Sequence, residues 1–166
     1  MSKSERSDIQ IRQISKEFSF NVVTYTIQLE EMLTMIICLE LSKDWMKMGP
    51  YMDYFDNVGF ESKINLAEII LKANHSHILK KFPKIIEEIR TMKILRNNVA
   101  HRNRHYEMDS EGKNTKFVLF HRKINKQIRF TESQMLQRTK KLEKCVNDMQ
   151  KVLGFFGRDF NIKAIV

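Results

Sequence analysis

The segment IRTMKILRNNVAHRNRH carries three side chains that together could cleave RNA, Arg96, Asn97 and His101. Cleavage without a metal requires a base that takes the proton from the ribose 2′-hydroxyl, a cation that neutralises the charge gathering on phosphorus, and an acid for the leaving oxygen. Histidine can act as base or acid, arginine can supply the cation, and asparagine can orient the phosphate or either side chain. We therefore select Arg96, Asn97 and His101 as candidate catalytic residues.

The spacing of these residues has a consequence for assembly. On an ideal helix Asn97 and His101 share a face, whereas Arg96 and His101 are turned from each other by roughly 140°. A groove at a twofold interface would bring a second Arg96 and a second His101 alongside the first pair and form a symmetric cationic site. The sequence therefore predicts a homodimer.

The hexapeptide RNNVAH resembles the motif of the HEPN superfamily, which is an arginine, usually followed by a polar residue, with a histidine a few positions further on. HEPN domains are helical bundles with this motif in their second half, so the resemblance covers the chain from about Val22 to Phe156. It implies a metal-independent endoribonuclease that acts as a dimer and leaves a 2′,3′-cyclic phosphate, as in toxin-antitoxin, phage-defence and RNA-processing systems. Arg96 takes the arginine position of the motif, Asn97 the polar position and His101 the histidine position.

Two interpretations without catalysis stay open. The resemblance also allows a noncatalytic module that binds RNA, a nucleotide or a protein. Alternatively, Arg96 and His101 are basic residues favoured by the dipole at a helix C-terminus, and the neighbouring asparagines help the helix to end. The chain also departs from toxins that pair with a nucleotidyltransferase antitoxin, since it has Asn103 where these often carry a tyrosine.

The chain is basic, with 29 Lys and Arg against 20 Asp and Glu and a net charge of +9. Such a surplus attracts polyanions through phosphate contacts and counterion release, so RNA is the partner we expect. Arg102, Arg104 and His105 follow the motif directly and are the candidate RNA-binding residues. Further cations could extend a phosphate-binding surface or form a solvated basic face: Lys113, Lys116, Arg122, Lys123, Lys126 and Arg129.

We predict neither a metal nor a cofactor. His101 and His105 are spaced to hold a metal on one helix face, and His75 and His77 form a second pair. Neither pair has a convincing third ligand, and the arginines beside His101 would repel a divalent cation. We therefore place His75 and His77 in a polar loop. The scattered glycines form no phosphate-binding loop.

The hydrophobic periodicity predicts a mainly all-α fold, a bundle of four to five helices with a short β-hairpin before the last long helix. One helix runs from about Asp8 to Lys43, and Gly49-Pro50 ends any continuation. A second covers FESKINLAEIILKA as far as Asn74, and a third starts near Pro83 and carries the motif.

The remaining elements follow the motif. KFVLFHRKINKQIRF contains two β-prone runs around an asparagine-containing turn, which indicates the hairpin. Thr131 and Gln134 fit a capping box at the start of the last helix. We find no linker or repeat, so we expect one domain over residues 1–166, with residues 1–7 as a flexible N-terminus.

Membrane insertion and secretion are not expected. The N-terminus has no apolar stretch of signal-peptide length, and the most apolar segment, MLTMIICLEL, has half of the ~20 residues that a membrane span needs. Cys38 and Cys145 fit reduced thiols in apolar helices. We expect a cytoplasmic homodimer whose partners are RNA and an antitoxin or regulatory protein.

Overall fold

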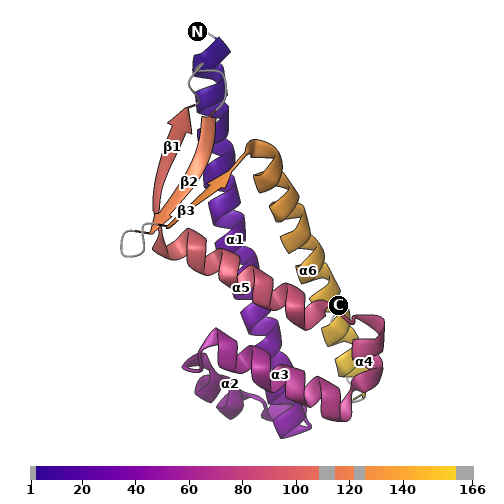
Figure 1. The fold of residues 1–166 in the computed structure, drawn as a ribbon. Coiled ribbons are helices and arrows are strands. Elements are labelled where there is room, and N and C mark those ends of the chain that lie inside the picture. The colour runs from indigo at the N-terminus through magenta and orange to yellow at the C-terminus, as the bar shows by residue number, and fades with distance from the viewer. Residues whose placement is uncertain (1–2, 109–114, 122–125, 160–166) are drawn as a thin grey trace. The chain divides into compact units, whose positions relative to one another are not determined.

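The computed structural model describes residues 3–108, 115–121 and 126–159. Over these residues the protein is mainly helical, with one antiparallel sheet of three strands (Figure 1). It divides into two compact units. Met1–Tyr25 and Ile94–Glu143 form the sheet unit, and Thr26–Lys93 and Lys144–Val166 form the helical unit.

The longest element is α1, which spans Lys3–Ser42 and begins earlier than its predicted start near Asp8. The hydrophobic periodicity that predicted this helix is confirmed, because most apolar side chains at helical spacing along it are buried, among them Phe18, Val22 and Leu29. By length and composition alone the part Ile9–Ser42 could also cross a membrane, with a mean hydropathy of 1.4 in its most apolar window. Of that window, 56% is buried inside the protein.

The sheet consists of β1 (Asn103–Met108), β2 (Thr115–His121) and β3 (Lys126–Phe130), in that order. The β2 and β3 strands confirm the predicted hairpin, whose turn lies outside the described residues. The β1 strand was not predicted, because we read its residues as part of a polar stretch. Its Tyr106 ring lies 5.9 Å from the Phe117 ring and its hydroxyl lies 2.8 Å from Ser15 Oγ of α1. These contacts dock β1 on the same helix as the predicted strands.

Aromatic packing holds the sheet on α1. The Phe18 ring of α1 lies 5.5 Å from the Phe130 ring of β3, which lies 6.2 Å from the Phe117 ring of β2. All three side chains are at most 2% exposed. This face of the sheet is therefore its core face, and Figure 1 shows the strands beside the N-terminal half of α1.

The helices α5 (Ile85–His101) and α6 (Glu132–Asp159) correspond to the third and last predicted helices. Hydrophobic periodicity predicted the last helix, and its apolar residues at helical spacing are buried: Met135, Leu142, Cys145, Met149, Val152 and Phe156. The predicted capping box is also present. The backbone N–H of Gln134 donates to Thr131 Oγ1 at 3.2 Å, and the backbone N–H of Thr131 donates to Gln134 Oε1 at 2.9 Å.

The helical unit holds the short helices that periodicity did not predict. These are a 3-10 turn, η1 (Trp45–Lys47), the helix α2 (Gly49–Asp56) that follows it, and α4 (Ser76–Lys81). The helix α3 (Phe60–Asn74), which precedes α4, is the second predicted helix. We predicted that Gly49-Pro50 only ends a helix. Instead, Pro50 lies in the first turn of α2, where its missing N–H is not needed.

His75 is also placed differently from the prediction of a polar loop. It lies between α3 and α4, is 6% exposed, and its Nε2 is 3.0 Å from Glu40 Oε2 of α1. Glu40 Oε1 accepts hydrogen bonds from Asn74 and Lys43. Burial acts to raise the pKa of Glu40, but the hydrogen bonds from Lys43, His75 and Asn74 outweigh it and hold this pKa below its usual range. A carboxylate-centred polar cluster is thus part of the core.

Substituting Thr131 tests the capping box. Thr131→Ala should lower the free energy of unfolding by about 1 kcal/mol, because one N–H of the first turn of α6 loses its acceptor. Urea unfolding measures this change. Thr91→Ala is the matched control, since this exposed mid-helix threonine bonds only the carbonyl of Glu87 and should change stability by less than about 0.5 kcal/mol. Equal effects of the two substitutions would contradict the assignment.

The buried carboxylate of Glu40 should make stability depend on acid pH. Because the pKa of Glu40 is lower in the folded state, its ionised carboxylate stabilises the fold fully above the unfolded-state pKa of about 4.3. This stabilisation is lost as the pH falls through the folded-state pKa. Urea unfolding should therefore show a smaller loss of stability below this pH for Glu40→Gln than for the wild type. Glu31→Gln, at an exposed glutamate of the same helix, should keep the wild-type dependence.

Candidate functional site

The candidate catalytic residues lie on the last two turns of α5, within the sheet unit. Arg96 is half-buried, whereas Asn97 and His101 are exposed. Arg96 Nη1 donates a hydrogen bond to Asn97 Oδ1 at 3.3 Å, so these neighbouring side chains are already paired. Among the described residues, no hydrogen bond or ion pair holds the His101 imidazole. The imidazole is thus available to an external ligand.

The two sides of this helix end differ in character. Leu95 and Val99 are buried, whereas Ile94 is 62% exposed and lies on the same face as Asn97 and His101 by helical spacing. Arg96 is rotated from His101 by roughly 140°. The structure thus brings Asn97 and His101 to one face, links Arg96 to that face only through Asn97, and adds an exposed isoleucine. Sequence reasoning missed Ile94, although its position one turn before Asn97 is the available signal.

The candidate RNA-binding residues do not share one surface. Arg102 follows the last residue of α5, and its Nη1 donates to the backbone carbonyl of Lys126 at 3.2 Å, which ties the start of β1 to β3. Arg104 and His105 are consecutive in β1, so their side chains project from opposite faces of the sheet. Arg104 shares the side of Tyr106, the core face, and is exposed at its margin, whereas His105 lies on the outer face.

An ion-paired network occupies part of that outer face. Arg129 Nε lies 2.7 Å from Glu107 Oε2, and His105 Nε2 lies 3.5 Å from Glu107 Oε1. The hydrogen bonds and charge of Arg129 hold the pKa of Glu107 below its usual range. Lys116 and Lys126 are exposed, whereas the other expected cations lie outside the described residues: Lys113, Arg122 and Lys123. The charge of Arg129 is therefore largely compensated and that of Lys116 is more available to a phosphate.

The histidine spacing that could have held a metal is not realised on one helix, because α5 ends at His101 and His105 belongs to β1. Across residues 3–108, 115–121 and 126–159, no group of three or more His, Cys, Asp and Glu side chains is arranged to hold a metal ion.

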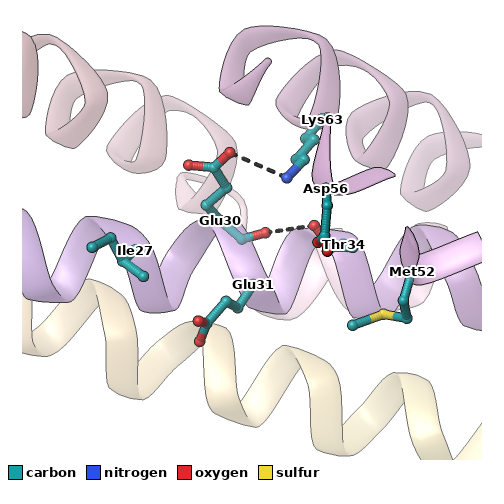
Figure 2. Close-up of a pocket in the computed structure, with 7 residues that line it drawn as sticks. All are labelled: Ile27, Glu30, Glu31, Thr34, Met52, Asp56 and Lys63. Carbon is teal, nitrogen blue, oxygen red and sulfur yellow. Dashed lines mark hydrogen bonds and ion pairs between the residues drawn. The ribbon is translucent and has the colours of Figure 1, made fainter. Parts of the chain in front are cut away.

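A pocket of about 120 Å³ lies in the helical unit and contains none of these candidates. Figure 2 shows its lining residues: Ile27, Glu30, Glu31, Thr34, Met52, Asp56 and Lys63. Lys63 is 4% exposed, and its Nζ lies 3.1 Å from Glu30 Oε1. Since its one cation is already paired and three of its seven lining residues are carboxylates, this pocket is a poor site for a phosphate.

Searches against protein-family models, curated proteins and solved structures find no match to this chain.

The exposure of the site predicts that its residues are dispensable for folding. Arg96→Ala and His101→Ala should each change the free energy of unfolding by less than about 1 kcal/mol, because neither removes a buried partner. Leu95→Ala, at a buried position of the same turn, should cost about 2 kcal/mol or more. Urea unfolding of the three variants measures these free-energy changes. Destabilisation by Arg96→Ala and His101→Ala equal to that by Leu95→Ala would favour a structural role for the motif.

Proposed function

We propose that this protein is a metal-independent endoribonuclease of the HEPN type that acts as a homodimer. The observation that carries the proposal is the exposed array at the end of α5. Arg96 is paired only with Asn97, and His101 has no polar partner among the described residues. The three residues thus have the identities needed for RNA cleavage and no evident role in holding the fold together.

Each residue has a role in the proposed reaction. His101 takes the proton from the ribose 2′-hydroxyl, and the 2′-oxygen attacks the neighbouring phosphorus. The Arg96 guanidinium, oriented by Asn97, stabilises the charge of the pentacoordinate phosphorane. The bond from phosphorus to the 5′-oxygen then breaks, and that oxygen takes a proton from water, while the proton held by His101 returns to the solvent. The products are a 2′,3′-cyclic phosphate and a 5′-hydroxyl.

Two features support a site shared between two chains. The angular separation of Arg96 and His101 keeps both from pointing at one phosphate from the same helix. The exposed Ile94 gives the His101 face an apolar side chain that a second copy could bury. The net charge of +9 suits an RNA substrate. We further propose a cytoplasmic protein that needs no cofactor or membrane and is controlled by an antitoxin or regulatory protein.

A noncatalytic RNA-binding module is the second candidate. The same angular separation favours it, because one chain alone does not bring Arg96 and His101 together. In that case the helix end contacts phosphates without turnover, and RNA binding should depend on salt concentration but leave the RNA intact.

Cleavage of a mixture of total RNA and tRNA in EDTA tests the proposal. The wild type should produce new 2′,3′-cyclic phosphate ends, and His101→Ala and Arg96→Ala should lower the rate by at least about a hundredfold, as expected when a general acid-base group or a charge-stabilising donor is lost. The ends are identified by whether they accept ligation before and after removal of the cyclic phosphate.

His77→Ala is the matched control, since it removes an exposed histidine of the helical unit and should keep full activity. Intact RNA with the wild type would overturn the nuclease and favour the noncatalytic module. Equal cleavage by the wild type and His101→Ala would show that the activity does not come from this site.

A further inference from the structure

The sheet has a second face, opposite the one that packs on α1. Because strand side chains alternate, it is formed by the residues at odd-numbered separations from Tyr106 in β1 and from Phe117 in β2, and by their register partners in β3. We call it the outer face. It is formed by Asn103, His105 and Glu107 of β1, Lys116, Val118 and Phe120 of β2, and Gln127 and Arg129 of β3.

One end of the outer face is aromatic and amide-rich. Phe120 is paired in register with Asn103 on one side and Gln127 on the other, so two amide side chains flank its ring. The His105 ring lies 6.3 Å from the Phe120 ring, at an interplanar angle of 71°. Phe120 is half-buried, whereas Phe117 and Phe130 of the core face are at most 2% exposed.

At the other end of the outer face, most polar side chains are paired with one another. Val118 is fully buried there, although it points away from α1, and its partners in register are His105 and Arg129. Glu107 accepts hydrogen bonds from Arg129 Nε and Nη2 at 2.7 and 3.2 Å, and Arg129 also donates to Gln127. Lys116 is exposed and has no ion pair among the described residues. The face therefore combines an accessible ring with one uncompensated cation.

We infer that the outer face binds single-stranded RNA, with one base stacked on Phe120. Aromatic side chains on a sheet stack bases without regard to sequence, and amide groups can reach the edge of a stacked base. Asn103 and Gln127 are placed for that second role, and Lys116 for a neighbouring phosphate. A duplex would not offer the face of an internal base, so the ligand is a single strand.

Charge on the outer face suits this ligand. Its cations among the described strand residues are Lys116 and Arg129 and its single acid is Glu107, whereas Arg104 and Lys126 belong to the core face. The outer face also lies close to the candidate catalytic residues, because Asn103 is two residues after His101, within roughly 7 Å along the backbone. A strand held on Phe120 would thus pass the end of α5. Cleavage of the bound strand rests on the proposed function, whereas binding of RNA to the outer face does not.

Binding of a short 2′-O-methyl oligouridylate to the full chain, followed by fluorescence anisotropy, tests the inference. The wild type should bind the single strand more tightly than a 2′-O-methyl duplex of the same length. Phe120→Leu should weaken single-strand binding by roughly tenfold, because stacking on the ring is lost. Phe120→Tyr should keep near-wild-type affinity, since it keeps the ring.

Phe20→Leu is the matched control, as it removes a ring that is 69% exposed on α1 of the same unit and should not affect binding. Equal affinities of Phe120→Leu and Phe20→Leu would overturn the inference. If Phe120→Leu fails to fold, crosslinking of a 4-thiouridine probe to the wild type decides. A crosslink to the β2 peptide supports the inference, and crosslinks confined to other peptides overturn it.

The probe lacks a free 2′-hydroxyl, so the result does not depend on cleavage. Ring-dependent binding by a chain that leaves ordinary RNA intact would overturn the nuclease and keep the outer face as an RNA site. Cleavage of ordinary RNA together with ring-independent binding would overturn the outer face alone.

Discussion

The pairing of β1 with β2 is the constraint on which the candidate site depends. The backbone of β1 is hydrogen bonded to β2 in a register that runs from Asn103 opposite Phe120 to Met108 opposite Thr115, so these residues cannot continue the helix before them. Tyr106 fixes the strand through its contacts with Ser15 and Phe117. The helix α5 therefore ends at His101, and the motif lies on an exposed helix end beside a sheet edge.

A reaction at an exposed helix end requires additional structure around it. Catalytic groups act best when water is excluded and the substrate is held in place, and neither condition is met by a single turn of helix. The site therefore needs two additional surfaces. We propose that a second copy of the chain covers the face with Ile94 and His101, and that the outer face of the sheet holds the RNA strand. The pocket of the helical unit does not supply a surface for RNA, because its lining includes three carboxylates and one cation that is already paired.

Local sequence signals predicted the parts of the fold that depend on neighbouring residues. The stripes of α1 and α6, the β2–β3 hairpin and the reciprocal bonds of Thr131 and Gln134 were all readable from periodicity or spacing. Non-local partners decided the rest. Tyr106 holds β1 in place by its contact with Ser15 of α1, which is far away in sequence. His75 is hydrogen bonded to Glu40 of the same helix. For the site, the motif could be located, but the separation of Arg104 and His105 onto opposite faces required the strand.

Mixed dimers test most directly whether two chains build the site. Arg96→Ala and His101→Ala chains, each inactive alone, would be coexpressed with different tags, purified as the mixed assembly and given RNA in EDTA. Because each chain keeps the group that the other lacks, and because one helix cannot direct both groups at one phosphate, the account predicts partial recovery of cleavage. Mixed assemblies as inactive as either parent, beside a wild type that cleaves, would contradict it.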